Sequence, residues 1–485
     1  MKWTILAEIL YALVVVLVCL RIIWDTRRPS KALAYLLLVI FLPLAGIFVY
    51  FSFGINYRKR KMFSKKILGD DALADNLQQH IVQYSRVTAK EHAAAVAPAE
   101  SLAWLLARDS LSALTAGNDV KLLINGEEKF PEVFAAVAEA KHHIHIEYYI
   151  FEDDDTGQQL IHALTEKSNE GVTVRFIYDD FGSHALKKKT LQHMKAAGIR
   201  VFPFSKIRFI ALANRLNYRN HRKIIVIDGC TAFVGGINVS ERYVNTDANP
   251  QRLFWRDTHL RIDGAGAYYV QYLFLCDWNF CAKDHLQACP EFFPDPAQLQ
   301  QKGNAIVQIA ASGPDSDRPT ILFAILQAIK LAKQEILITT PYFIPGESIL
   351  DALMSASLSG VQVKILVPGK SDSRVVNAAA WSNYGDLLRA GAAIYLYRKG
   401  FVHAKTLVTD NSVAMVGTAN MDYRSFDLNF EVNAIVYGEQ AAKALREVFY
   451  RDLQDAEKID PAAWRNRPVM KQLGEKCARL ISPML

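Results

Sequence analysis

The sequence has little cysteine, and none of it is closely paired. Six cysteines are spread over 485 residues without a C-x-x-C pair. This excludes a disulfide-stapled secreted domain and argues against structural zinc sites, whose ligands usually come in closely spaced pairs. One group leaves zinc open as an alternative, although cysteine in a helix and its following loop is more often apolar filler. The group comprises Cys276, Cys281, His285 and Cys289.

The body of the chain also lacks positive charge. The formal net charge is +7, but residues 1–66 hold 11 of the 56 Lys and Arg and only 2 of the 49 Asp and Glu. The remaining residues carry 45 basic and 47 acidic side chains. A protein that binds nucleic acid neutralises phosphates with a basic body. The charge distribution therefore argues against nucleic acid as a partner and disfavours a membrane-anchored nuclease.

Long apolar runs are confined to the first 66 residues, which predict a membrane anchor. The runs at residues 3–23 and 32–53 are each long enough, at about 1.5 Å per helical residue, to cross a hydrocarbon core of about 30 Å. A signal peptide is disfavoured by Glu8 and by the second run that follows directly. The basic cluster at residues 58–66 favours the cytoplasmic side. We therefore expect a two-helix transmembrane hairpin with both ends in the cytoplasm.

One pattern, H-x-K-x4-D-x6-G-x2-N, occurs twice with all its spacings preserved. The residues around each copy are β-branched and apolar, which predicts a buried strand. The two copies are His221, Lys223, Asp228, Gly235 and Asn238, and then His403, Lys405, Asp410, Gly417 and Asn420.

The spacing of this pattern indicates its chemistry. Side chains two apart on a strand share a face, so each histidine lies beside its lysine. A neutral imidazole can attack or carry a proton, an ammonium can hold an anion, and the asparagines add neutral donors. We expect Asp228 and Asp410 to hold turns rather than take part in the chemistry. Two such sets predict a symmetric pocket for phosphodiester transfer that needs no metal or other cofactor.

This duplicated motif resembles that of the phospholipase D superfamily. The variants Gly235-Gly236 and residues 417–425 resemble those of bacterial cardiolipin synthases. The superfamily's commoner Gly-Ser is absent from both copies, and a hydroxyl survives only as Thr418. The resemblance implies an enzyme of the bacterial inner membrane that converts two phosphatidylglycerols of the lipid bilayer into cardiolipin and glycerol. It also implies a phosphatidyl-histidine intermediate, with His221 as nucleophile and His403 as general acid and base.

Two carboxylates occupy matching places after the two motifs. They are Asp257, in Trp-Arg-Asp-Thr, and Glu431, in Asn-Phe-Glu-Val-Asn. In the two-motif enzymes that the chain resembles, the carboxylate of one lobe pairs with the histidine of the other. The resemblance therefore implies that Glu431 pairs with His221 and Asp257 with His403.

In the rest of the chain, the alternation of expected strands and helices predicts an internal repeat of α/β type. The expected strand at residues 120–124 corresponds to one at 306–309, and the expected strand at 144–151 corresponds to one at 336–343. We expect two tandem phospholipase D-like α/β lobes related by a pseudo-two-fold axis, preceded by the two-helix transmembrane anchor. The expected divisions are an anchor at 1–66, a helical connector at 67–118, lobes at 119–285 and 305–460, a linker at 286–304 and an amphipathic tail at 461–485.

Three further features have alternative interpretations. The cluster of His142, His143 and His145 could hold a metal, or it could be an ordinary part of the chain where a helix ends and a strand begins. The mixed basic and apolar segment 206–212 is either buried or dips into the lipid headgroups. The tail resembles it, with an apolar face separate from Lys471, Lys476 and Arg479. That face comprises Met470, Leu473, Cys477, Leu480 and Ile481.

Three other functions stay open on the sequence alone. Water in place of the second alcohol would make the protein a phospholipase D, and another donor such as phosphatidylethanolamine would change the product. A non-catalytic lipid-binding scaffold would be expected to have lost a histidine or lysine from one motif, and neither copy has lost one.

Overall fold

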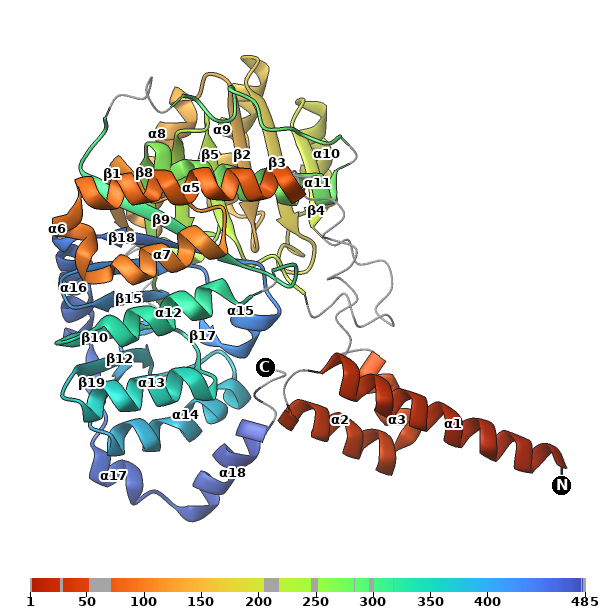
Figure 1. The fold of residues 1–485 in the computed structure, drawn as a ribbon. Coiled ribbons are helices and arrows are strands. Elements are labelled where there is room, and N and C mark those ends of the chain that lie inside the picture. Colours follow the sequence, from red (N-terminus) through yellow and green to blue (C-terminus); the bar gives the residue numbers. More distant parts are fainter. Residues whose placement is uncertain are drawn as a thin grey trace. The chain divides into compact units, whose positions relative to one another are not determined.

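The computed structural model describes residues 2–26, 29–51, 71–204, 218–245, 252–282, 284–295, 301–316, 318–480 and 482 (Figure 1). It divides into two compact units. The first comprises Met1–Ser64 with Ile207–Tyr218, and the second comprises Lys65–Lys206 with Arg219–Leu485. The basic cluster at 58–66 and the segment 206–212 lie outside the described residues.

The first unit contains α1 (Lys2–Asp25), α2 (Pro29–Phe41) and α3 (Pro43–Val49). Among the described residues, α1 is the one helix long and apolar enough to cross a membrane. The expected span at 32–53 is not one helix, because it is interrupted at Leu42, where ψ is 67°. Pro43 causes the break, since its ring excludes the helical conformation from the residue before it. The two-helix transmembrane anchor is therefore not confirmed.

After this break, α3 folds back along α2. A Cβ at Gly46 would come within 2.6 Å of the Leu38 carbonyl, so the two backbones touch and leave room only for glycine. At the end of α3, the Tyr50 hydroxyl lies 3.4 Å from Asp25 Oδ2, and its ring lies 5.5 Å from that of Tyr35. The chain has thus returned to the junction between α1 and α2.

The second unit is built on a 15-stranded sheet. From the middle outward, one half runs β1 (Thr115–Ile124), β8 (Thr258–Asp263), β6 (Thr231–Gly235), β5 (Lys223–Ile227), β2 (His143–Tyr148), β3 (Thr173–Asp179) and β4 (Arg200–Phe204). The other runs β9 (Ala305–Ser312), β18 (Glu431–Tyr437), β16 (Val413–Gly417), β15 (Thr406–Thr409), β10 (Glu335–Thr339), β12 (Gln362–Pro368), β13 (Ala393–Tyr397) and β19 (Ala456–Lys458).

The seven strands of the first half correspond in order to seven of the second, which adds β19 at its edge, and the predicted pair of α/β lobes is confirmed. They meet where β1 pairs antiparallel with β9. In each lobe the motif strand (β5 or β15) lies antiparallel between two neighbours, β6 and β2 in the first lobe and β16 and β10 in the second. Every residue of both strands is buried, which explains their apolar, unalternating sequences.

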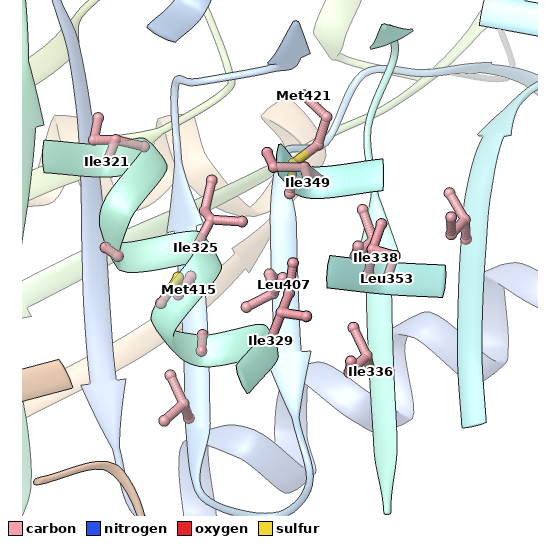
Figure 2. Close-up of a cluster of buried hydrophobic side chains, with 14 of the residues drawn as sticks. Ile321, Ile325, Ile329, Ile336, Ile338, Ile349, Leu353, Leu407, Met415 and Met421 are labelled. Atoms are coloured by element: carbon pink, nitrogen blue, oxygen red, sulfur yellow. The ribbon is translucent and has the colours of Figure 1, made fainter. Parts of the chain in front are cut away.

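Helices cover the lobes and complete their cores. Figure 2 shows the second core, where Ile325 and Leu353 from two helices pack toward Ile338 and Leu407 on the sheet. Burial of each such side chain contributes about 1.5–3 kcal/mol. The helices are α8 (Asn125–Glu139), α9 (Asp155–Asn169), α10 (Lys188–Ala196) and α11 (Tyr268–Cys281), then α12 (Thr320–Leu331), α13 (Glu347–Leu358), α14 (Arg374–Arg389), α15 (Tyr423–Asp427), α16 (Glu439–Gln454), α17 (Pro461–Arg465) and α18 (Val469–Leu480).

The segment expected to be a connector belongs to the second lobe's core. Its helices are α5 (Asp71–Glu91), α6 (Ala93–Val96) and α7 (Glu100–Asp109). Leu102 and Leu106 of α7 are fully buried in the same cluster as Ile321 of α12. The following strand β1 begins at Thr115, before the expected lobe boundary at 119. Between α11 and β9, residues 284–295 and 301–304 contain no helix or strand.

Candidate active site

Main-chain hydrogen bonds tie each motif histidine to the opposite lobe. The His221 N–H donates to the Phe430 carbonyl at 2.9 Å, and the His403 N–H donates to the Arg256 carbonyl at 2.7 Å. The second contact extends a parallel pair of short strands, β14 (Gly400–Val402) and β7 (Phe254–Arg256). In both cases the residue that accepts the hydrogen bond directly precedes a carboxylate, so the backbone itself delivers Glu431 and Asp257 to the histidines.

The side chains complete two pairs that cross between the lobes. His221 Nδ1 lies 3.0 and 2.9 Å from the two Glu431 carboxylate oxygens. His403 Nδ1 lies 2.7 Å from Asp257 Oδ2. A carboxylate at Nδ1 places the proton of a neutral imidazole there and leaves the Nε2 lone pair available. The structure thus brings together the two pairs that the resemblance implied.

Burial keeps both imidazoles neutral. It lowers the pKa of His221 to about 4, against the opposing influence of Glu431. Burial and then the Lys405 ammonium lower the pKa of His403 to about 3, against Asp257. At neutral pH both rings therefore carry one proton, the state in which Nε2 can act as a nucleophile or a base.

The two motif lysines are buried beside the histidines. Burial, followed by repulsion from Lys405, lowers the pKa of Lys223 to about 7. Burial lowers the pKa of Lys405 to about 8, although Asp257 opposes the shift. Lys223 Nζ donates to the His221 carbonyl at 2.8 Å, and Lys405 Nζ lies 3.1 Å from His403 Nε2. A bound phosphodiester would supply the negative charge that these ammonium groups lack.

The two motif asparagines occupy equivalent places but have different partners. Asn238 Nδ2 donates to the Tyr243 hydroxyl at 2.8 Å, and its Oδ1 accepts from the Ile150 N–H at 3.1 Å. The Asn420 main-chain N–H donates to Ser425 Oγ at 3.1 Å, while its buried side-chain oxygen has no hydrogen-bond partner among the described residues. Asn238 is thus held by the first lobe's own framework, whereas the Asn420 side chain hydrogen-bonds Asp422 of its own lobe.

The motif aspartates lie at the far ends of the motif strands, away from the histidines. Asp228 accepts hydrogen bonds from the N–H groups of Lys141, His142 and His143 at 2.8–2.9 Å. Asp410 accepts three from residues 333–335 at the same distances. Both adopt left-handed backbone conformations, with φ of 49° and 50°, which aspartate tolerates in turns. Both aspartates thus hold turns, which is the role expected from the sequence.

The roles of Thr418 and Gly236 depend on distances in the structure and could not be inferred from the spacing of the motif. Thr418 donates its hydroxyl to Glu431 Oε2 at 2.5 Å, so the surviving hydroxyl fixes the longer carboxylate. Gly236 is its counterpart in the first lobe, where a Cβ would come 2.2 Å from Asp257 Oδ1. The shorter carboxylate reaches its histidine only because that position lacks a side chain. This difference was visible in the sequence, because Gly235 is followed by glycine in the first copy whereas Gly417 is followed by threonine in the second.

Aromatic rings flank both histidines, and sequence analysis missed them. The Tyr149 ring lies edge-on to His221 with centroids 4.9 Å apart, and the Trp255 and His403 centroids are 5.5 Å apart. Trp255 stands two residues before Asp257, a spacing that would have placed it on the same face of an extended segment.

The groups considered as metal sites have other partners. His143 Nε2 and His145 Nδ1 lie 3.3 and 3.2 Å from Gln271 Oε1, and an Arg175 guanidinium nitrogen lies 3.1 Å from His145 Nε2. A guanidinium at that nitrogen is incompatible with a metal ion there. Across the described residues, which include all four members of the cysteine group, no three His, Cys, Asp or Glu are arranged to hold a metal.

Comparisons with known proteins agree with this geometry. The family model described as the cardiolipin synthase, phospholipase D-like domain matches residues 133–250 and 325–453, and a phospholipase D-nuclease N-terminal model matches residues 9–54. The major cardiolipin synthase of Bacillus subtilis is 40% identical over 492 residues, covering 99% of both chains. A cardiolipin synthase of Geobacillus sp. (strain WCH70) is 40% identical over 99% of this chain and 93% of its own.

A solved structure supports the fold alone. The phosphatidylserine synthase of Haemophilus influenzae Rd KW20 matches with a TM-score of 0.58 at 14% identity, over 76% of this chain and 95% of that one. With the duplicated motif, the two crossed histidine–carboxylate pairs and the full-length relatives in agreement, the chain belongs to the cardiolipin synthases of the phospholipase D superfamily.

Proposed function

We propose that the protein joins two phosphatidylglycerols into cardiolipin with release of glycerol, by a ping-pong transphosphatidylation. The observation that carries the proposal is the pair of buried, neutral imidazoles, each oriented by a carboxylate of the other lobe and each beside a motif lysine. A phosphodiester repels nucleophiles and has a poor alkoxide leaving group, so the reaction needs charge neutralisation, a nucleophile and a proton donor.

In the first half-reaction His221 Nε2 attacks phosphorus, the new P–N bond forms, and the P–O bond to glycerol breaks. The departing oxygen takes a proton from His403. The lowered pKa of His403 keeps its ring neutral, but the negative charge of a bound phosphodiester raises this pKa, and Lys405 Nζ holds a proton 3.1 Å from its Nε2. Both lysines donate to the carbonyl of their own motif histidine, but Lys405 Nζ also lies 2.9 and 3.1 Å from the two ring nitrogens of His403, which supports His403 rather than His221 as the acid.

In the second half-reaction the primary hydroxyl of another phosphatidylglycerol gives its proton to His403 Nε2 and attacks phosphorus. The P–N bond breaks, His221 is restored, and the number of phosphodiesters is unchanged. The aromatic and apolar surroundings of both histidines favour a lipid alcohol over water. The Lys223 ammonium binds the phosphate oxygens throughout, and Lys405 regains the proton that it passed to His403 when the second hydroxyl is deprotonated.

The catalytic lobes lie on the cytoplasmic side of the membrane in this proposal. The support is the cluster of six basic residues at positions 58–66, directly before the second unit, because such clusters remain in the cytoplasm. The substrate is then drawn from the cytoplasmic leaflet.

The test uses purified full-length protein with phosphatidylglycerol carrying one label in its acyl chains and another in its free glycerol. The proposal expects cardiolipin and free glycerol in equal amounts, including in the presence of a chelator. Phosphatidic acid with glycerol, and no cardiolipin, would instead identify hydrolysis. Turnover of phosphatidylethanolamine in preference to phosphatidylglycerol would change the donor. His403→Ala protein serves as the matched control for contaminating lipases.

A further inference from the structure

A cavity of about 510 Å³ lies in the second lobe, between α14, α17 and α18, and no active-site residue lines it. Of these helices, α14 packs against both α17 and α18 (Figure 1). Two tryptophans, Trp381 and Trp464, contribute to its wall. The Arg467 guanidinium lies 3.4 Å from the Trp464 ring centroid, and Lys471 Nζ lies 4.6 Å from that of Trp381. The wall thus combines flat apolar surface with cations.

The cavity lining carries an excess of positive charge. Its two carboxylates already have partners: Glu475 accepts from both terminal nitrogens of Arg467 at 2.8 and 2.9 Å, and Asp386 pairs with Arg389. Three further lining cations are Arg465, Lys476 and Arg479. Within the described part of the chain, no carboxylate lies within ion-pair distance of these three. The cavity therefore suits an anion.

The helix that closes this cavity, α18, has its polar and apolar faces reversed relative to a soluble protein. Glu475 is only 4% exposed and faces the lobe, whereas Met470 is 76%, Leu473 51% and Leu480 81% exposed. With 3.6 residues per turn, these three apolar residues and the exposed Cys477 form one stripe. The stripe was predicted from sequence, although Ile481 lies outside the described residues. A solvent-facing apolar stripe on a helix is typical of a surface that enters another apolar phase.

We propose that this region docks on the membrane surface and that its cavity holds the phosphate of an anionic phospholipid. Lys476 and Arg479 lie on the flank of α18 between its buried face and the apolar stripe, so a lipid whose acyl chains lie beside the stripe presents its headgroup to the cavity. Charge complementarity selects an anionic bilayer as the occupant, because cations next to an apolar helix face bind such surfaces. The site is separate from the reaction centre and does not depend on the proposed chemistry.

The experiment places a polarity-sensitive fluorophore on Cys477, the one cysteine among the described residues that is exposed. The full-length protein is reconstituted in phosphatidylcholine vesicles with or without phosphatidylserine, and a lipid-borne quencher reports insertion. We expect quenching that increases several-fold with phosphatidylserine. The increase should disappear in Arg465→Glu/Lys476→Glu/Arg479→Glu protein and in Leu473→Asp/Leu480→Asp protein, with thermal unfolding unchanged.

A matched charge reversal at three exposed lysines of α10, Lys188→Glu/Lys189→Glu/Lys195→Glu, is the control and should keep the full increase. An equal loss in this control would show that net charge, not the cavity, causes binding, and would overturn the proposal. So would a phosphatidylserine effect that survives in both α18 variants. Binding of soluble glycerol 3-phosphate to detergent-solubilised protein, unaffected by the Leu473→Asp/Leu480→Asp change, would identify a free-phosphate site and contradict the membrane source.

The α2–α3 pair supports a second, independent inference about the membrane unit. At about 1.5 Å per residue, α2 is about 20 Å long, short of the hydrocarbon thickness of about 30 Å. The Tyr50 hydroxyl at the end of α3 returns to within 3.4 Å of Asp25, at the end of α1. From this geometry we infer that α1 crosses the bilayer and that α2 and α3 enter and leave it on the same side.

The charge pattern agrees with this re-entrant arrangement. Of the 11 basic residues in positions 1–66, four lie at 21–31, six at 58–66 and one at position 2. A two-span hairpin would put the group at 21–31 outside and the group at 58–66 inside, whereas the re-entrant path puts both on the cytoplasmic side.

The test is the accessibility of a neutral epitope tag placed before residue 1 of the full-length protein, in intact spheroplasts and in inside-out vesicles. We expect the tag to be accessible in spheroplasts while α10 of the first lobe, probed by biotinylation of its lysines, is accessible only in inside-out vesicles. Accessibility of tag and lobe on the same side would contradict the re-entrant path and restore the hairpin.

Discussion

The two lobes share one framework and differ at the atoms that orient their histidines. In both, a main-chain hydrogen bond from the histidine N–H reaches the residue before the opposite carboxylate. In one half-site the carboxylate is Glu431, fixed by the Thr418 hydroxyl; in the other it is Asp257, which packs against bare Gly236. The duplication thus conserves strand order and backbone contacts while the two sets of side chains are free to specialise. This fits two histidines with unequal tasks.

The largest expected effects come from the histidines themselves. Replacing either His221 or His403 with alanine should lower cardiolipin formation by roughly 10²–10⁴-fold or more, because each change removes a nucleophile or a general acid. The variants should differ on a substrate with a nitrophenyl leaving group, which needs little protonation: His403→Ala should release a burst of nitrophenol and His221→Ala none. Equal behaviour of the two variants on this substrate would contradict unequal tasks.

Alanine at the equivalent positions 236 and 418 should lower turnover by unequal amounts. Gly236→Ala brings a Cβ to 2.2 Å from Asp257 Oδ1, so the carboxylate must move, and we expect turnover to fall about 10–100-fold. Thr418→Ala removes one hydrogen bond to Glu431, which keeps its contact with His221, and should cost about tenfold. Thr418→Ser retains the hydroxyl and serves as the control. A larger loss of turnover for Thr418→Ala than for Gly236→Ala would contradict the expectation that Asp257 depends more on Gly236 than Glu431 depends on Thr418.

The pH dependence of kcat/KM should separate the two lysines. Their pKa values of about 7 for Lys223 and about 8 for Lys405 are lowered, so rising pH removes the ammonium charges that bind phosphate. We expect kcat/KM to fall by about tenfold per pH unit or more above pH 8, while the imidazoles, with pKa values near 4 and 3, stay neutral throughout. Because arginine stays charged, we expect Lys405→Arg protein to show only the fall caused by deprotonation of Lys223, whose pKa is about 7. A profile that stays flat to pH 10 would show that neither ammonium is needed.

The smallest effects on chemistry are expected at the motif aspartates, and they should be alike in the two lobes. Asp228→Asn and Asp410→Asn each weaken three hydrogen bonds from main-chain N–H groups at the far end of a motif strand. We expect a loss of roughly 1–3 kcal/mol of stability, seen as a lower midpoint of thermal inactivation. The kcat of the folded fraction should be unchanged. A large fall in kcat at full stability would contradict a purely structural role for the two aspartates.

Local patterns explain how much of the site the sequence could predict. The duplicated spacing identifies the strands that carry His221 and His403, and the repeat alignment identifies Asp257 and Glu431 as counterparts. What escaped prediction depends on tertiary distances. The space at Gly236 matters only because Asp257 arrives there from another strand. Composition likewise cannot show that α18 turns Glu475 inward, since the packing of α14 decides which face is covered.

The second expected span was not confirmed for a different physical reason. Hydropathy counts the apolar residues of 32–53 but ignores their order, so a helix broken at Pro43 scores the same as a continuous one. The proline was visible in the sequence, and its effect on Leu42 is local. The helical connector was expected from the sequence, but its packing was not, because Leu102 and Leu106 are buried only against the second lobe's core.

The central claim is that the phosphatidyl group is held covalently by one lobe's histidine while the other lobe's histidine moves the proton. The most direct measurement is to trap the enzyme-bound phosphatidyl group in His403→Ala protein with a labelled nitrophenyl substrate. Because phosphohistidine is acid-labile, the protein is digested under alkaline conditions and the labelled peptide is mapped. The account predicts label on the peptide containing His221 and none in His221→Ala protein. Covalent label that persists in His221→Ala protein but vanishes in His403→Ala protein would contradict the assignment.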